Sequence, residues 1–158
     1  EDDTRMVHDF MSDPSAKTIV CGGTSATIVS RVLGKRLDVS LDYVDPEIPP
    51  IAYMEGVDLV TEGVLTLNRV VQLLRRYAKN ETVSETFFEE LDKNNGASMV
   101  AKILIEDCTE VHLYVGKAIN SAYQNPGLPF DLGIRQNLVE QLKSVIEEIG
   151  KKVVVTYY

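Results

Sequence analysis

The sequence lacks several features that would assign it to a particular class of protein. Only two cysteines, Cys21 and Cys108, occur in its 158 residues, which is too few for a disulfide framework. We interpret both as packing residues in a protein of the reducing cytoplasm. No apolar run approaches the roughly 20 residues that a membrane-spanning helix needs. We therefore expect neither a membrane span nor a secretory signal peptide.

Positive charge is also scarce, because 16 Lys and Arg residues stand against 24 Asp and Glu residues, for a net charge of −8. Such a surface repels nucleic acids and anionic membranes, so we expect neither as a partner. The length, with 44% apolar and 25% charged residues, predicts one folded domain with its own hydrophobic core. The chain begins with Glu1 rather than methionine, and we expect it to be a fragment of a longer protein.

Common catalytic and nucleotide-binding patterns are missing as well. Neither the dinucleotide fingerprint GxGxxG nor the P-loop GxxxxGK[ST] occurs, and no set of nucleophile, base and acid is recognisable. His8 and His112 fall in separate predicted elements, so we expect no metal site shared between them. We interpret Asp42, Asp45 and Glu47 as a solubilising acidic surface rather than as ligands of a hard cation. We expect no cofactor in this chain.

Short apolar segments alternate with segments of helical periodicity along the chain. The expected core strands are 18–21, 57–60, 111–115 and 153–157. Segments such as 64–79 and 138–149 place apolar residues on one helical face. This alternation predicts a single three-layer, Rossmann-like α/β domain, with a mostly parallel sheet and helices on both faces. In the segment 37–43 apolar and polar residues alternate strictly, which predicts a strand at or near a sheet edge.

The turn after the first predicted strand is the first candidate for a binding site. Gly22-Gly23-Thr24-Ser25 leads from the strand into a helix. Glycines allow a ligand to approach the backbone, and the first amides of a helix attract anions. The alternative is structural, because glycines also form tight turns and Thr or Ser residues also cap helices. Two related turns in one sheet favour the binding interpretation.

The second related turn is Thr61-Glu62-Gly63, after the second core strand. Glu62 adds a carboxylate that can accept hydrogen bonds from ligand hydroxyls or amines. Lys117 and Asn120 follow the third core strand and add positive charge and an amide. The carboxyl ends of parallel strands meet at one sheet edge, where open α/β sheets bind ligands. The sequence therefore predicts a site for a small anionic or polar metabolite.

Several longer stretches carry a resemblance to a known family. They are CGGTSATIVSRVLGK, DYVDPEIPPIAYMEGVDLVTEGVLTL, VGKAIN followed by QNPGLP, and the closing KKVVVTYY. They resemble the region C-terminal to the catalytic domain in SpoIIE-like protein serine phosphatases, which belong to the bacterial PP2C-type superfamily. The resemblance covers essentially the whole chain, and the run that ends at Leu67 is its most specific part.

The resemblance implies a cytoplasmic bacterial signalling protein that dephosphorylates a phosphoserine or phosphothreonine partner with Mn²⁺ or Mg²⁺. In this family the metal-binding aspartates lie in the preceding domain. Segment 58–63 is similar to a late phosphatase motif of Thr-Asp-Gly-Val type, but Glu62 stands at the aspartate position. No metal ligand is therefore carried over to this chain. The implied role is an accessory domain that binds a small ligand, contacts its own phosphatase domain and biases its activity.

Two alternatives remain from the residues. The GGTSA and DLVTEG turns are loosely similar to those of sugar-phosphate isomerases and coenzyme A transferases, which predicts an independent enzyme with Glu62 as its base. In the second alternative the chain is a dimerisation or docking module that binds no small ligand. Phe87 and Phe88, or segment 48–54, would then form its apolar contact patch.

Overall fold

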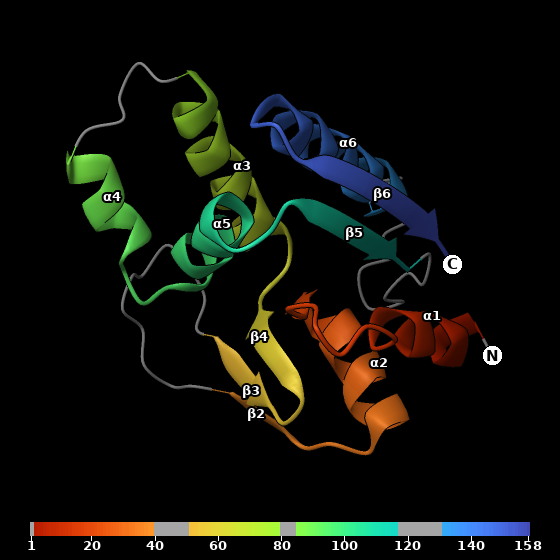
Figure 1. Cartoon of the computed structure of the whole chain (residues 1–158). Helices are drawn as coiled ribbons and strands as arrows, with labels where there is room; N and C mark the ends of the chain where they lie inside the picture. Colours follow the sequence, from red (N-terminus) through yellow and green to blue (C-terminus); the bar gives the residue numbers. More distant parts are fainter. Residues whose placement is uncertain (1, 40–50, 80–84, 117–130) are drawn as a thin grey trace.

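The structure, a computed structural model, describes residues 2–39, 51–79, 85–116 and 131–158 (Figure 1). Helices and strands both occur along these residues, which confirms the α/β prediction in its general form. The elements in chain order are α1 Asp2–Phe10, β1 Ile19–Cys21, α2 Gly23–Leu33, β2 Leu37–Val39, β3 Ala52–Met54, β4 Val57–Thr61, α3 Val64–Lys79, α4 Glu85–Leu91, α5 Gly96–Glu106, β5 Glu110–Val115, α6 Asp131–Glu148 and β6 Lys152–Tyr157.

The described strands form two sheets rather than one. The larger sheet has the order β1-β4-β3-β2, in which β1 and β4 are parallel while β3 is antiparallel to both of its neighbours. Strands β5 and β6 form a separate parallel pair, from Glu110 opposite Lys152 to Val115 opposite Tyr157. The prediction of a single, mostly parallel sheet was therefore wrong, and the four-stranded sheet is mixed.

An antiparallel hairpin explains the difference between the predicted and the observed sheet. Strands β3 and β4 are joined by Glu55-Gly56, with Met54 opposite Val57. Gly56 has a φ of 89°, which glycine adopts at little cost and which suits a two-residue turn. The hairpin leaves β2 at the sheet edge, as the alternation in segment 37–43 predicted. The part of that segment after Val39 lies outside the described residues.

Two hydrophobic clusters lie on opposite faces of the four-stranded sheet. Because successive strand residues point to opposite faces, Leu59 of β4 belongs to one cluster and Val60 to the other. Ile19 and Val20 of β1 divide in the same way. Helices α3, α4, α5 and α6 contribute to the cluster of Leu59, and α1 and α2 to the cluster of Val60 (Figure 1). Helices therefore cover both faces of this sheet.

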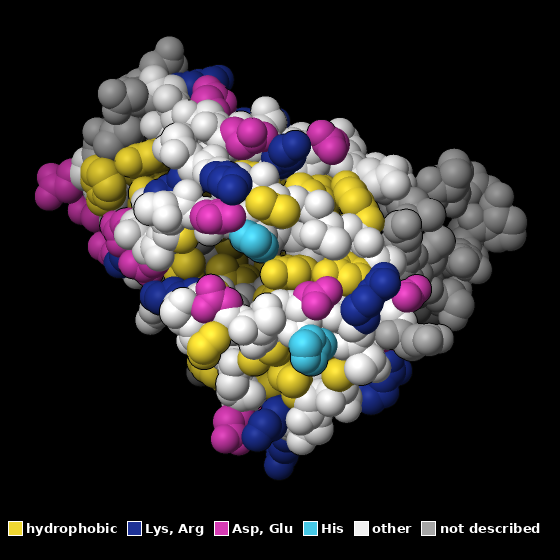
Figure 2. All heavy atoms as spheres, turned by 45° about the vertical axis from the view of Figure 1, so that its right-hand side comes forward, with side chains coloured by type: hydrophobic (Ala, Val, Ile, Leu, Met, Phe, Trp, Pro, Cys, Tyr) yellow, Lys and Arg dark blue, Asp and Glu magenta, His cyan; other side chains and the backbone are white. Residues whose placement is uncertain are grey.

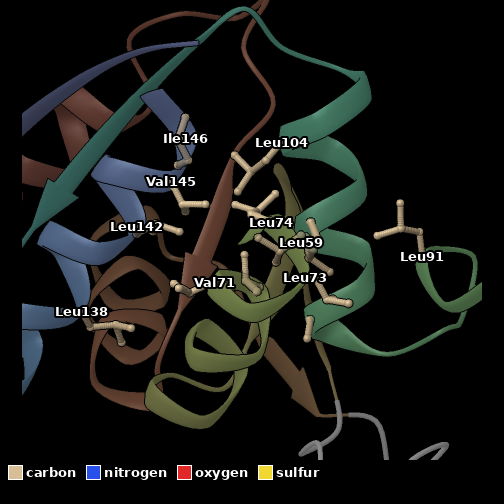
Figure 3. Close-up of a cluster of buried hydrophobic side chains, with 14 of the residues drawn as sticks. Leu59, Val71, Leu73, Leu74, Leu91, Leu104, Leu138, Leu142, Val145 and Ile146 are labelled. Atoms are coloured by element: carbon tan, nitrogen blue, oxygen red, sulfur yellow. The ribbon is translucent and has the colours of Figure 1, made fainter. Parts of the chain in front are cut away.

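Aliphatic side chains from three helices form the centre of the larger cluster (Figure 3). Leu74 of α3 and Ile146 of α6 are both 0% exposed. Leu142 and Val145 lie on the same side of α6, as the stripe of apolar residues in its sequence predicted. Leu104 of α5 completes the contact between the helices. This packing holds α3, and with it the turn that precedes α3, in a fixed position.

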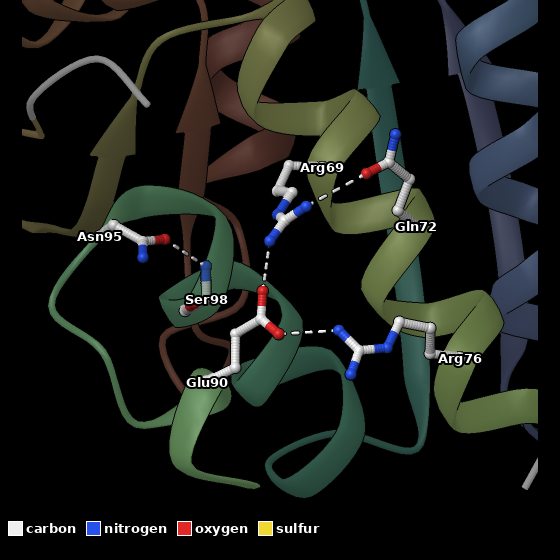
Figure 4. A network of polar contacts seen from close by, with 6 residues as sticks. All are labelled: Arg69, Gln72, Arg76, Glu90, Asn95 and Ser98. Carbon is white, nitrogen blue, oxygen red and sulfur yellow. Dashed lines mark hydrogen bonds and ion pairs between the residues drawn. The ribbon is translucent and has the colours of Figure 1, made fainter. Parts of the chain in front are cut away.

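An ion-pair network attaches α4 to α3 (Figure 4). Nη1 of Arg76 lies 2.7 Å from Oε2 of Glu90, and Arg69 pairs with the other oxygen of the same carboxylate. The guanidinium of Arg76 also lies 5.2 Å from the ring centroid of Phe87. Phe87 is 0% exposed and cannot contribute to an apolar docking patch, whereas Phe88 is 43% exposed.

The outer surface carries charges of both signs. On the face shown in Figure 2, acidic and basic side chains are interspersed around exposed hydrophobic side chains.

The hydroxyl of Tyr158 donates to Oδ2 of Asp9 over 2.7 Å, so the residue that follows β6 lies against α1. Within the described ranges, no helix has the length and apolar character that crossing a membrane requires.

Candidate functional site

The two glycine-containing turns lie side by side at the carboxyl ends of β1 and β4. These strands are parallel neighbours, with Cys21 opposite Thr61. The amide of Gly22 donates to the carbonyl of Thr61 over 2.9 Å, so the hydrogen-bonded ladder continues into the first turn. The sequence analysis expected these two turns to lie at the same sheet edge, and the structure places them next to each other. That they bind a ligand stays a prediction.

The geometry of these turns favours glycine at two positions. Gly22 has a φ of 110°, a conformation that residues with a Cβ rarely adopt. Gly63 packs directly on it, because a Cβ on Gly63 would lie 3.3 Å from the Cα of Gly22. The turns thus approach each other more closely than most side chains would permit.

Helix α2 begins without a side-chain cap. Gly22 is its N-cap residue and makes no side-chain hydrogen bond, and neither Thr24 nor Ser25 acts as the cap. The first amides of a helix have no intrahelical acceptor, so those of Gly23, Thr24 and Ser25 form a region of positive potential. A Cβ on Gly23 would meet no heavy atom of the described residues within 4 Å. The described residues therefore leave room for a side chain at position 23.

Glu62, in the second turn, has an unpaired carboxylate oxygen. Its Oε2 atom is buried, and no group in the described part of the chain donates a hydrogen bond to it. Its backbone carbonyl accepts the hydroxyl of Thr61 at 2.9 Å. A purely structural role for Glu62 as a cap of α3 would pair its carboxylate with backbone amides, and Oε2 makes no such bond. Burial without a donor costs about 1–3 kcal/mol, and more for a charged group.

Thr66 is a candidate that the sequence-based prediction missed. It lies four residues after Glu62, in the first turn of α3, and is 0% exposed. Its Oγ1 atom is the second buried side-chain oxygen without a hydrogen-bond partner in the described residues. Thr66 shares a helical face with the buried Val70 and Leu73. One polar residue within an apolar stripe marks Thr66 in the sequence, although this pattern does not show that its hydroxyl is unpaired.

Cys21 lies at the end of β1, beside Thr61 and Glu62. Burial raises the pKa of its thiol, a hydrogen bond with Thr61 lowers it, and the negative charge of Glu62 raises it again. The net pKa lies above the ordinary value of a cysteine thiol. A protonated, shielded thiol is a poor nucleophile. This agrees with the interpretation of Cys21 as a packing residue.

The start of α5 packs against the second turn. Gly96 packs on Thr61 so closely that a Cβ would lie 3.0 Å from the Cγ2 of Thr61. Asn95 caps the helix, because its Oδ1 accepts the amide of Ser98 at 2.8 Å. Ser98 itself lies inside the first turn of α5. The 61–63 turn is thus fixed by contacts on both sides.

The remaining candidates lie outside the described residues or apart from the turns. Lys117 and Asn120 are not described, and neither are Asp42, Asp45 and Glu47. Across 2–39, 51–79, 85–116 and 131–158, no group of three or more His, Cys, Asp or Glu residues is arranged to hold a metal ion.

Comparison of the chain with protein-family models, curated proteins and solved structures gives no match. The resemblance to SpoIIE-like phosphatases therefore remains a prediction from the residues that carry it. The described residues show an uncapped helix start in one turn and an unpaired buried carboxylate oxygen in the other, and the backbones of the two turns are in contact at Gly22 and Gly63.

Proposed function

We propose that this chain is a regulatory domain that binds a small ligand where the 22–25 turn meets the 61–63 turn. The observation that carries the proposal is the buried, unpaired Oε2 of Glu62. A ligand hydroxyl or ammonium that donates to Oε2 would recover the hydrogen bond that the oxygen lost on burial. The open start of α2 would hold an anionic or polar group of the same ligand.

The proposal includes a Rossmann-like, three-layer organisation of the region around the site. Open α/β sheets of this kind bind ligands beyond the carboxyl ends of parallel strands. Support comes from β1 and β4, which are parallel and are each followed by a glycine turn and a helix. Lys117 and Asn120 would contribute from the turn after β5. The two described sheets would then act as parts of one ligand-binding fold.

The regulated activity is proposed from the family resemblance. Ligand binding would bias a Mn²⁺- or Mg²⁺-dependent serine/threonine phosphatase domain of the same cytoplasmic protein. Coupling between such sites is typically worth 1–3 kcal/mol, which is about a 5- to 150-fold change in affinity. The direction of the effect would be measured as dephosphorylation of a phosphoserine protein, with and without the ligand.

A thermal-shift screen of polar metabolites against this chain tests the binding proposal. A ligand that binds the folded state raises the melting temperature in a saturable way. We expect the shift to be abolished by Gly23→Val, which places a side chain at the open start of α2, and by Glu62→Ala. Gly133→Val is the matched control, because Gly133 also lies in the first turn of a helix and a Cβ there meets no described atom within 4 Å.

The result that contradicts the proposal is a confirmed ligand whose shift persists in both Gly23→Val and Glu62→Ala. In that case the ligand binds elsewhere on the chain. If the ligand is consumed, Glu62→Gln distinguishes a binding domain from the alternative enzyme. A variant that still binds but no longer turns the compound over would assign Glu62 as a general base.

A further inference from the structure

Strand β6 forms the outer edge of the β5–β6 pair. In this pair β5 lies on the side nearer to the four-stranded sheet, and β6 lies on the far side (Figure 1). The amide of Lys152 donates to the carbonyl of Thr109, and the amide of Tyr158 donates to that of Val115. Because bonding groups alternate in direction along a strand, the amides and carbonyls of the odd-numbered residues in 153–157 point away from β5. Among the described residues, no strand pairs with this edge.

The outer edges of the two sheets differ in their protection against pairing. Strand β2, at the edge of the four-stranded sheet, has only three residues, and the middle one, Asp38, is charged and exposed. Short edge strands and charged side chains prevent association between sheet edges. Strand β6 has six residues in unbroken register with β5, and from Val153 to Tyr157 it contains no charge, glycine or proline. Such an edge is suited to pairing with a further strand.

The small size of the β5–β6 sheet also favours an added strand. Sheets of two strands are marginal by themselves, and parallel pairing is slightly weaker per residue than antiparallel pairing. Val153 packs against the cluster that contains Ile146 of α6, whereas Thr156 and Tyr157 remain exposed. A strand added beside β6 would widen the sheet and pair its outward backbone groups.

The charges near this edge fit a second copy of the same chain. If two β6 strands pair antiparallel about Val155, Lys152 of one copy falls opposite Tyr158 of the other, because each lies three residues from Val155. The two copies of Lys152 then lie at opposite ends of the paired strands. The hydroxyl of Tyr158 donates to Asp9 of α1, a helix that carries three aspartates against one arginine. Lys152 of each copy therefore faces the acidic helix of the other.

We propose that this protein forms a two-fold symmetric dimer by antiparallel pairing of β6 with β6 of a second copy. In this register Val153 of one copy lies opposite Tyr157 of the other, and pairs of aromatic and β-branched residues stabilise antiparallel strands. The same pair occurs twice, as a two-fold interface requires. The dimer surface does not include the 22–25 or 61–63 turns, so this inference does not rest on the proposed ligand site.

Analytical ultracentrifugation of the whole chain over a wide concentration range tests the proposal. We expect a reversible monomer–dimer equilibrium, which Val155→Pro and Thr156→Lys should each weaken by about tenfold or more. Proline at position 155 removes an amide that points away from β5, so the β5–β6 ladder keeps its bonds. Lysine at the exposed position 156 adds a charge to each copy next to the two-fold axis.

Tyr53→Lys is the control for Thr156→Lys, because it places a lysine at an exposed strand position of the other sheet. It should dimerise as the wild type does. Circular dichroism establishes that each variant is folded, and Thr156→Lys keeps the test valid if Val155→Pro does not fold.

Cross-linking tests the register of the pairing. Val155→Cys should form an intermolecular disulfide on oxidation, because Cα atoms in a hydrogen-bonded antiparallel pair lie about 5.5 Å apart. Thr156→Cys should not, since Val154 of the other copy lies opposite it. The unmodified chain, with free Cys21 and Cys108, sets the background. The proposal is overturned by a wild type that is monomeric at every concentration, by a dimer that persists in every folded edge variant, or by cross-linking at position 156 rather than 155.

Discussion

The amide nitrogen of Gly22 donates a hydrogen bond to the carbonyl oxygen of Thr61, with the two atoms 2.9 Å apart. This bond joins two turns that are about 40 residues apart in the sequence, and it lies one residue beyond the last strand pair, Cys21 and Thr61. The parallel ladder thereby sets the relative position of the α2 start and Glu62. The arrangement of the site is a direct continuation of the sheet.

The contact between the turns predicts different effects for two glycine-to-alanine substitutions. Gly63→Ala should destabilise the protein by about 1–3 kcal/mol, because its Cβ would lie 3.3 Å from the Cα of Gly22 and would force the turns apart. Gly23→Ala should change stability by less than about 0.5 kcal/mol, since that Cβ meets open space. Urea unfolding monitored by circular dichroism measures both. Equal effects would mean that the turns are not in contact in solution.

The unpaired hydroxyl of Thr66 predicts a substitution that stabilises the ligand-free protein. Thr66→Val keeps the shape of the side chain and removes a buried oxygen without a described partner, so it should raise the free energy of unfolding by about 1 kcal/mol. Thr61→Val is the comparison, because the Thr61 hydroxyl donates to the Glu62 carbonyl. It should lower the free energy of unfolding by about 1 kcal/mol. A loss of stability in Thr66→Val would show that its hydroxyl has a partner in solution.

The ion pairs of Glu90 predict a stability difference that depends on acid pH. Burial raises the pKa of Glu90, but the hydrogen bond from Arg76 and the charges of Arg69 and Arg76 outweigh burial and hold it below the ordinary 4.5. A depressed pKa contributes stability that is present above the unfolded-state value and is lost as pH falls through the folded-state value. Glu90→Gln should therefore cost about 1 kcal/mol at pH 7, and the cost should shrink below pH 4.5.

Glu89→Gln controls for the charge change, because Glu89 lies next to Glu90 on the same helix and is exposed. It should leave both stability and its pH dependence close to those of the wild type. Chemical denaturation at several pH values between 3 and 7 compares the three proteins. A cost for Glu90→Gln that is constant across this range would contradict the assigned role of the arginines.

The hydrogen bond from Tyr158 to Asp9 predicts a pH dependence at the alkaline end. Burial, the bond to Asp9 and the charges of Asp9 and Tyr114 raise the pKa of Tyr158 to about 12, against a smaller opposing effect of Arg5. A raised pKa contributes stability that is complete below the unfolded value of 10.0 and is lost as pH rises through the folded value. Tyr158→Phe should thus be less stable than the wild type at pH 8.

The difference between Tyr158→Phe and the wild type should disappear between pH 10 and about 12. Tyr157→Phe is the matched control, since it removes a neighbouring hydroxyl from a side chain that is 39% exposed. Its stability should follow that of the wild type over the whole range. Urea unfolding monitored by circular dichroism at pH 8, 10 and 12 provides the measurement. If both variants behave alike, the bond to Asp9 contributes nothing measurable.

Local signals in the sequence predicted most of the elements near the site. The apolar strands before Gly22 and before Glu62 were identified from their composition. These features depend on neighbouring residues only. The Glu55-Gly56 turn was also a local signal for a hairpin, and it was missed. That omission led to the prediction of a mostly parallel sheet.

Other features depend on contacts that the sequence does not specify. Phe87 and Phe88 are adjacent and chemically identical, yet one is 0% and the other 43% exposed. The difference arises from the position of α4 on α3, where Arg76 lies over the ring of Phe87. The missing hydrogen-bond partners of Glu62 and Thr66 are likewise a result of packing. No pattern in the sequence shows which polar atoms remain unpaired.

The sequence by itself therefore determined where the chain turns from strand to helix and which turns carry glycine and a carboxylate, because backbone conformation and hydrophobic periodicity are local. Only the tertiary structure decided that the turns of Gly22 and Gly63 touch and that Oε2 of Glu62 is buried without a donor. It also divided the strands into two sheets. Strand pairing and burial are set by the competition of distant segments for the same core, which a single sequence does not resolve.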